Sequence, residues 1–302
     1  MNNLQKILIV GGTGTLGQPT TKLLSQAGYV IRIMTRKPEK QKELVSRNIE
    51  FVKGDLTDAA SLTSACAGMD TVIVMAHSLL GTGKYKSEKV DLTGHQSLID
   101  VAVAGGIKRM IYISGLGHTA DRKFDFWIYK HTIEEYLKKS GLIYTIIRPP
   151  AFMETHVHML LGKGILKNGK AMILGKGRNP TNFVAVADIA SLIKIVLENP
   201  SAQNRLIEFG GPDNMSKNDI AKLYGRLANK EVKFTHLGTG FLKVMSKIIK
   251  PIHPGIARIM TLSIIADETD QTYTISKEQK EFQVPLTSIE DFVKQQVDQA
   301  KR

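Results

Sequence analysis

The sequence is poor in cysteine, in acidic residues and in long apolar runs, and each shortage excludes a class of protein. Its 302 residues include one cysteine, Cys66, so no intramolecular disulfide can form and a reducing, cytoplasmic location is predicted. No apolar run is long enough to span a bilayer, which predicts a soluble chain without stable membrane insertion. The first strand is expected from about residue 6, which leaves no room for a signal peptide.

Acidic residues are outnumbered: 28 Asp and Glu stand against 41 Lys and Arg, a formal net charge of +13. Such a balance is typical of proteins that meet nucleic acid, anionic membrane surfaces or anionic ligands. The lysines are spread over many expected helices and form no arginine-rich cluster, so solvated lysine faces are the simpler interpretation and no nucleic-acid partner is predicted. Two acid-free stretches, 155–187 and 232–266, fall where a substrate lobe is expected, and an anionic substrate is one interpretation of them.

The stretch Lys6–Gly17, KILIVGGTGTLG, predicts a strand, a glycine-rich turn and the start of a helix. Gly11 permits a tight turn, Gly14 lets backbone approach a pyrophosphate, and Gly17 lets the helix pack close to the strand. The pyrophosphate would lie at the helix N-terminus, on free N–H groups. The dinucleotide-binding residues predicted here are Gly11, Thr13, Gly14, Thr15, Leu16 and Gly17. The plainer alternative is a tight turn without a ligand.

The end of the second expected strand, Tyr29–Met34, distinguishes the two nicotinamide dinucleotides. An acidic residue at this place binds the ribose 2′-hydroxyl of NAD, but here the chain has Arg36 and Lys37. A guanidinium suits a 2′-phosphate. The sequence therefore predicts NADP(H), although Arg36 is also explained as a surface residue.

Further strands alternate with helices, one of them a long helix expected over Lys86–Ala104, and polar or small residues follow the strand ends. This alternation predicts an α/β fold, a doubly wound parallel Rossmann sheet, with a small C-terminal α+β substrate lobe. We expect a core at 1–150 and a lobe at 151–302, with 182–209 returning to the core sheet. Ligands bind such sheets at the carboxyl ends of the strands. The residues predicted to bind cofactor at those ends are Asp55, Leu56, Ala76 and His77, Asp55 as an acceptor for the adenine amino group; Ser114 also falls there. Asp58 is expected to act as an N-cap.

An amphipathic pattern marks Phe241–Lys250, with Lys243, Lys247 and Lys250 opposite its apolar residues. Such a stripe is typical of helices that lie on membrane surfaces. The simpler interpretation is a lobe helix that packs its apolar face inward.

Several segments together resemble the NmrA-like, atypical branch of the short-chain dehydrogenase/reductase superfamily: GGTGTLG with Arg36, GDLTD, MIYISGLG, IEEYLKKSGLIYTIIRPPAF and FVAVADIA. The resemblance covers most of the chain. It implies that Gly11, Gly14 and Gly17 hold the pyrophosphate, Arg36 the 2′-phosphate, Asp55 the adenine and Lys130 the nicotinamide ribose. It also implies that the segment from Pro149 through Phe152 to Met153 borders the nicotinamide and the substrate.

The sequence departs from that superfamily at its proton donor. Reductases of the superfamily carry a tyrosine one helical turn before the lysine, but the residue four positions before Lys130 is Phe126. Tyr129 points about 100° away from Lys130 on a helix. Other possible donors are His131, His118 and Ser114. Lys130 and Ser114 are the predicted catalytic residues, and no metal site is predicted.

Three functions remain open at this point. The first is an NADPH-dependent oxidoreductase that reduces a small organic substrate, a carbonyl compound, quinone or conjugated alkene, by hydride transfer. The second, favoured by Phe126, is a non-catalytic NADP(H)-binding sensor, regulator or assembly factor. The third is a protein of the membrane surface. A monomer or homodimer is expected.

Overall fold

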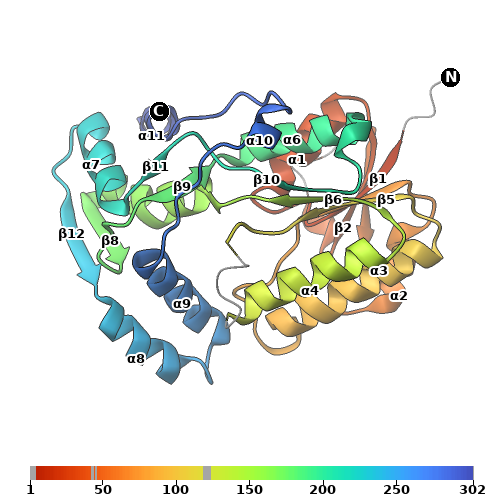
Figure 1. Ribbon diagram of the computed structural model, residues 1–302, viewed down its shortest axis with the longest axis horizontal. Coiled ribbons are helices and arrows are strands. Elements are labelled where there is room, and N and C mark those ends of the chain that lie inside the picture. Colours follow the sequence, from red (N-terminus) through yellow and green to blue (C-terminus); the bar gives the residue numbers. More distant parts are fainter. Residues whose placement is uncertain (1–4, 42–43, 45, 118–123, 302) are drawn as a thin grey trace. The chain divides into compact units, whose positions relative to one another are not determined.

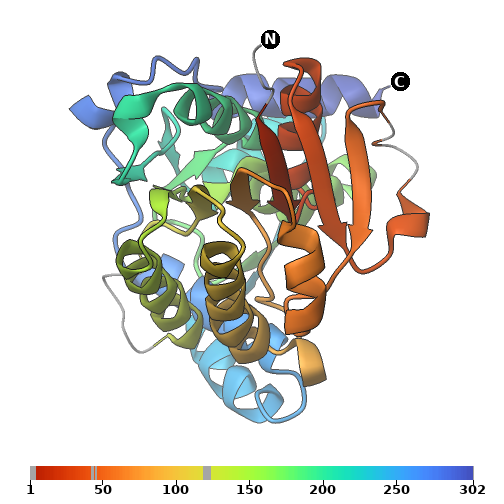
Figure 2. The same cartoon turned by 90° about the vertical axis from the view of Figure 1, so that its right-hand side faces the viewer.

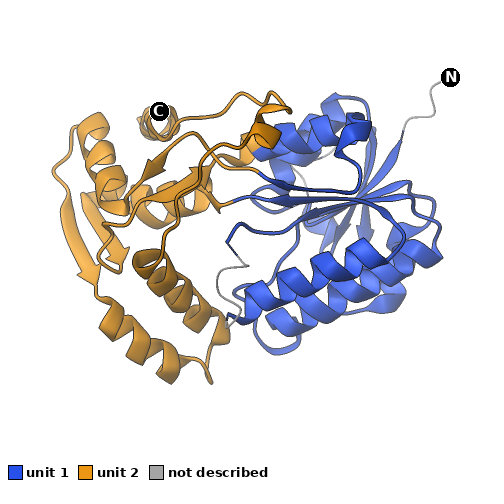
Figure 3. Ribbon diagram, viewed as in Figure 1, with its two compact units in different colours: residues 1–149, 189–208 blue, residues 150–188, 209–302 orange. Residues whose placement is uncertain are grey.

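The computed structural model describes residues 5–41, 44, 46–117 and 124–301. The chain divides into two compact units (Figure 3), of which unit 1 contains residues 1–149 and 189–208 and unit 2 contains residues 150–188 and 209–302. The chain therefore passes from one unit to the other three times.

Unit 1 is built on a seven-stranded parallel sheet with the strand order β10-β6-β5-β4-β1-β2-β3. Its strands are β1 (Lys6–Val10), β2 (Val30–Thr35), β3 (Ile49–Lys53), β4 (Thr71–Val74), β5 (Arg109–Ile113), β6 (Ile143–Arg148) and β10 (Arg205–Glu208). The central strands are almost wholly buried, as in a sheet covered on both faces. This order is that of a doubly wound dinucleotide-binding fold and confirms the predicted fold class.

Helices cover both faces of this sheet: α2, η3, α3 and α4 lie on one face and α1 and α6 on the other (Figures 1 and 2). Their bounds are α1 (Gly17–Gln26), α2 (Ala59–Cys66), η3 (Glu88–Gly94), α3 (His95–Ala104), α4 (Asp125–Lys139) and α6 (Val186–Glu198), with short turns η1 (Pro38–Lys40), η2 (Gly83–Tyr85) and η5 (Pro200–Ala202). The long helix expected over about Lys86–Ala104 is present from Glu88 to Ala104, but its first part, Glu88–Gly94, is a π-helix. Gly94 lies so close to the Leu56 carbonyl that a Cβ would come within 2.6 Å of its oxygen.

Unit 2 contains a three-stranded sheet, β11-β9-β7, and a two-stranded parallel sheet, β12-β8. Its elements are β7 (Ala151–Phe152), η4 (Glu154–Gly162), α5 (Lys163–Asn168), β8 (Lys170–Leu174), β9 (Thr181–Val184), β11 (Asn214–Met215), α7 (Lys217–Ala228), β12 (Lys233–Leu237), α8 (Thr239–Ile249), α9 (Pro254–Glu268), α10 (Lys277–Lys280) and α11 (Ile289–Ala300). The expectation that 182–209 returns to the core sheet is corrected for its first part. β9 pairs with β7 and β11 instead, and only β10 joins the large sheet.

The two acid-free stretches belong to unit 2, where carboxylates from just beyond the second one offset part of their charge. Asp267 accepts hydrogen bonds of 2.9 Å from the backbone N–H groups of Lys176 and Gly177. Glu268 forms a 2.7 Å ion pair with Lys243. These stretches therefore do not form one purely cationic surface.

No helix within the described ranges is long and apolar enough to cross a membrane. Cys66 ends α2 with its side chain buried, and burial raises the pKa of its thiol to about 11. The thiol is therefore protonated and unreactive at neutral pH.

Candidate functional site

The glycine turn between β1 and α1 has the geometry that close approach of a phosphate requires. Gly11 has a φ of +93°, and a Cβ there would come within 2.6 Å of the Ala76 nitrogen. A Cβ on Gly17 would overlap the Gly11 carbonyl, so α1 packs against the turn only with glycine at this position. Gly14 is exposed, and a Cβ there would meet only the Gly11 oxygen, at 3.3 Å. The turn thus presents open backbone at Gly14, which fits the pyrophosphate of a dinucleotide.

A cleft in unit 1 follows the carboxyl ends of β1, β2, β3 and β4. It is lined by Val10, Gly11, Thr13, Met34, Thr35, Arg36, Gly54, Asp55, Leu56, Ala76, His77, Ser78, Tyr85 and Val90. Seven of the predicted cofactor residues are in this lining: Gly11, Thr13, Arg36, Asp55, Leu56, Ala76 and His77. Five others border the turn or strand without lining the cleft: Gly14, Thr15, Leu16, Gly17 and Lys37. Leu16 is buried, so only its backbone is available to a ligand.

Basic and aromatic side chains meet at one end of the cleft. The Arg36 guanidinium carbon lies 4.5 Å from the centre of the Tyr85 ring, and the Lys84 ammonium lies 4.8 Å from it. Arg36 is therefore held beside an aromatic surface with a second cation close by. Such a set suits an adenine ring together with a phosphate on its ribose.

Asp55 lies beside this cluster and is kept ionised by its neighbours. Its carboxylate accepts hydrogen bonds from the Thr57 N–H at 3.0 Å and the Thr57 hydroxyl at 2.9 Å. Partial burial opposes ionisation, but these bonds, with smaller contributions from Tyr85 and Arg36, lower the pKa of Asp55. Asp58 has the other predicted role, since its side chain accepts a bond from the Ala60 N–H and caps α2.

Lys130 does not line the cleft but lies close to Ile113, Tyr112 and Phe126. It projects from α4, is 4 % exposed, and its ammonium donates a 2.9 Å hydrogen bond to the carbonyl of Ile113, the last residue of β5. Burial lowers the pKa of Lys130 to about 8, while the charges of Asp91 and Glu134 act in the opposite direction. At neutral pH Lys130 is therefore mainly a cation that can release its proton.

Phe126 and His77 connect Lys130 to the cleft. The Lys130 ammonium lies 5.6 Å from the centre of the Phe126 ring, as residues four apart on one helix face should. The His77 ring, which lines the cleft, meets Phe126 edge-on at 6.1 Å. His77 is exposed where it lines the cleft, while neighbouring protein atoms and the charge of Lys130 lower its pKa to about 4, so its imidazole is neutral.

Two buried hydroxyl groups close to Lys130 form no hydrogen bond with the described residues. Ser114 directly follows Ile113, and neither its Oγ nor the hydroxyl of Tyr112 has a hydrogen-bond partner among the described residues. Buried polar atoms left unpaired are costly; Tyr112 lies within the hydrophobic core, whereas Ser114 directly follows the end of a strand, where ligands of such sheets bind. Pro149 closes the neighbouring strand end, where its carbonyl accepts a bond from Leu116 N–H.

The other predicted site residues lie apart from the cleft lining or outside the described residues. Phe152 lies in unit 2, in β7, which pairs with β9. His118 lies outside the described residues. Tyr129 and His131 flank Lys130 on α4 and are partly buried.

Three residues of this site were missed by the sequence analysis. Tyr85 and Lys84 come from the glycine-containing loop after β4, and an aromatic residue beside a basic one in that loop was the available signal. Asp91 is fully buried in η3, and its carboxylate accepts a 2.9 Å bond from the Ser78 N–H, which fixes the backbone next to His77. No local pattern marks Asp91, because its role depends on the π-helix.

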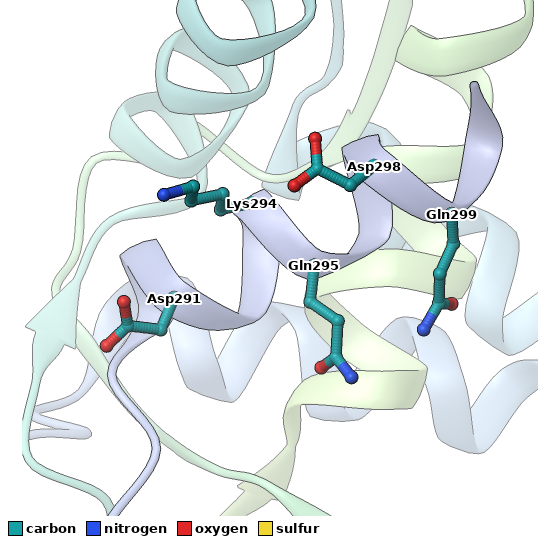
Figure 4. A pocket seen from close by; sticks show the side chains of 5 residues that line it. All are labelled: Asp291, Lys294, Gln295, Asp298 and Gln299. Carbon is teal, nitrogen blue, oxygen red and sulfur yellow. The ribbon is translucent and has the colours of Figure 1, made fainter. Parts of the chain in front are cut away.

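A second hollow lies on α11 and carries no comparable chemistry. Figure 4 shows its lining, Asp291, Lys294, Gln295, Asp298 and Gln299, all on one helix. These exposed polar side chains converge on no buried group, so the cleft in unit 1 is the better site.

Comparison with known proteins agrees with this geometry. The model of the NmrA-like family matches residues 3–293. An NAD(P)H azoreductase of Xenophilus azovorans is 26% identical over 229 residues, covering 76% of each chain. The photosystem II assembly factor Ycf39 of Cyanophora paradoxa is 29% identical, covering 79% of this chain and 73% of its own. The structure of an NADPH-dependent quinone oxidoreductase, QOR2, of Escherichia coli with NADPH superposes with a TM-score of 0.79 at 21% identity, covering 96% of this chain and 99% of the other.

Proposed function

The chain belongs to the NmrA-like family, and from that membership and the cleft in unit 1 we propose that it is an NADPH-dependent oxidoreductase. It reduces a small organic substrate, a carbonyl compound, quinone or conjugated alkene. The cofactor is NADP(H), as the names of an azoreductase relative and a fold neighbour state for those proteins. The single buried cysteine, Cys66, suits the reducing cytoplasm in which we place it.

The residues of unit 1 divide the binding of the cofactor among themselves. The turn at Gly11–Gly17 receives the pyrophosphate, and Arg36 with Lys84 and Lys37 receives the 2′-phosphate. Asp55 accepts the adenine amino group beside Tyr85. The segment after β4 at Ala76 and His77 borders the nicotinamide half.

Lys130 has two proposed roles in catalysis: it stabilises negative charge on the substrate and it donates a proton. The bound cofactor supplies a hydride to the substrate. The Lys130 ammonium donates one N–H to the Ile113 carbonyl. Its other two N–H groups can bind the nicotinamide ribose and the negative charge that develops on the substrate. With Phe126 unable to give a proton, Lys130 does so, and Ser114 positions the substrate oxygen. Pro149 is proposed to border the nicotinamide.

One observation carries this proposal: a buried ammonium of lowered pKa lies one helical turn from Phe126, whose ring meets the cleft residue His77. Oxidation of NADPH should be followed by its absorbance with a panel of quinones, aldehydes and azo dyes. Turnover of at least one class is expected. A panel that leaves NADPH unconsumed while it binds tightly would reject the reductase.

Phe126 supports a second candidate, an NADP(H)-binding protein without turnover. A phenylalanine where reductases of the wider superfamily use tyrosine removes a proton donor, and one relative is named as an assembly factor. This candidate predicts that NADPH and NADP+ bind with different affinities and that no substrate is reduced.

Arg36→Ala should remove most of the preference for NADPH over NADH. A hydrogen bond to a charged group contributes about 1.5–3 kcal/mol, so the affinity ratio should fall by roughly ten- to a hundredfold. Titration of nicotinamide fluorescence with both cofactors measures it. Lys40→Ala is a matched control, because Lys40 is exposed and outside the cleft lining. Equal affinities of the unmodified protein for both cofactors would contradict the role of Arg36.

A further inference from the structure

Helices α8 and α9 of unit 2 form an antiparallel hairpin that exposes an apolar ridge. Phe241, Val244 and Ile248 are 54%, 58% and 55% exposed, and Ile252, in the connection between the helices, is 80% exposed. The first three recur at the spacing of one helix face, while Leu242 faces α9 and is buried. The expectation that this stripe packs inward therefore holds for the buried Leu242 and the half-buried Met245 and Ile249, and is wrong for Phe241, Val244 and Ile248.

The connection between the two helices, at the tip of the hairpin, is a hydrogen-bonded turn. The N–H groups of Ile252 and His253 donate bonds of 2.9 and 2.7 Å to the Ile249 carbonyl, and His253 caps α9 by accepting a bond from the Ile256 N–H. Ile252 is thus held in the open by a hydrogen-bonded turn. A large apolar side chain fixed in water at a hairpin tip indicates a contact surface.

The charge next to the ridge indicates which surface it meets. Lys247, in the last turn of α8, and Lys250, the C-cap of α8, are exposed near the tip, and no acidic residue occurs from Val244 to Ala266. The acids of the hairpin, Asp267 and Glu268, lie at the opposite end of α9, where Glu268 pairs with Lys243. The half of the hairpin toward the tip therefore carries no carboxylate side chain.

We propose that this tip docks on anionic lipid membranes. Three residues of the ridge, Val244, Ile248 and Ile252, enter the interface, and Lys247 and Lys250 contact lipid headgroups. A convex cationic ridge fits a planar anionic surface better than it fits a second copy of itself, because the lysines of two tips would repel each other. An interfacial helix buries its apolar face about 5–10 Å into the headgroup region, and a ridge of this kind requires no transmembrane helix. The proposal is independent of whether the protein reduces a substrate.

Vesicle sedimentation tests the proposal with the full chain. Vesicles of equal parts phosphatidylglycerol and phosphatidylcholine should bind the protein, and vesicles of phosphatidylcholine alone should bind it much less. Lys247→Gln with Lys250→Gln should weaken binding about 25-fold, since each lysine near an anionic surface is worth about fivefold. Lys163→Gln with Lys167→Gln removes the same charge from exposed positions of α5 and should have a much smaller effect.

A second pair of variants tests insertion. Ile248→Ser with Ile252→Ser should weaken binding by at least about tenfold, because apolar atoms no longer enter the interface. Met172→Ser, at a 62% exposed position on β8, is the matched control. The proposal would be overturned if the control and the tip variants lost vesicle binding equally, or if the isoleucine changes left vesicle binding unaltered. So would a wild-type dimer that the tip variants dissociate, or a loss of NADPH affinity in them, since either would assign the ridge to the protein itself.

Discussion

Lys130→Ala should lower the rate of NADPH oxidation by about a hundredfold or more, well beyond any loss of NADPH affinity. The change removes the ammonium that is anchored on Ile113 and held one turn from Phe126. Steady-state rates with the best substrate of the panel, together with NADPH titration, separate the two effects. If the protein only senses its cofactor, the same variant weakens binding and there is no rate to lose.

The pH dependence of turnover gives an independent measure of the same residue. Because the pKa of Lys130 is lowered to about 8, its ammonium form prevails below that pH and is lost above it. Turnover that uses its proton should therefore fall as the pH rises through about 8, and Lys130→Ala should lack this fall.

Phe126→Tyr is the complementary variant, since it restores a phenol beside Lys130. A gain in carbonyl reduction would show that the site lacks only its proton donor. A wild type that turns over rapidly while Lys130→Ala leaves the rate unchanged would refute the role of this lysine.

Glu134→Ala should destabilise unit 1 by about 3 kcal/mol, because it removes the buried partner of Arg148 and leaves that guanidinium paired with the partly exposed Glu208 at 3.3 Å. The side chain of Glu134 is fully buried, and its two oxygens accept bonds from Arg148 of 3.0 and 2.5 Å. Urea unfolding followed by circular dichroism measures the loss. The adjacent Glu135→Ala is the control: Glu135 is 42% exposed and pairs with Lys138, and removing such a pair costs at most about 1 kcal/mol. Equal effects of the two variants would contradict the importance of the buried pair.

The sequence predicted those parts of the site whose position depends only on residues close together in the chain. The turn at Gly11–Gly17 lies within one strand–helix unit, so spacing alone indicates its geometry. Arg36 ends a strand adjacent to β1 in the sheet, and Phe126 and Lys130 share a helix face by their separation of four. In each case the backbone periodicity places the side chain without knowledge of the rest of the fold.

The parts that sequence left open depend on contacts between distant segments. Tyr85 contacts Arg36 across 49 positions of the sequence, and Asp91, in the π-helix η3, accepts a bond from the Ser78 N–H of the loop after β4. Similarly, β9 and β10 are both strands of four residues with a mixture of polar and apolar side chains, yet they join different sheets. The amphipathic pattern of α8 was recognised, but a pattern does not reveal which face its neighbour α9 covers.

During synthesis, unit 1 cannot complete its sheet when residue 149 leaves the ribosome. The edge strand β10 is made some 55 residues later, after the first segment of unit 2. Until then β6 is an unpaired edge, and the buried Arg109 lacks the carbonyls of Val196 and Leu197 to which it donates bonds of 2.6 and 3.0 Å. An exposed β6 is open to pairing with other chains. Truncation after residue 149 should therefore yield an aggregating fragment, and the nascent protein depends on sequence from beyond the first unit-2 segment to protect its own core.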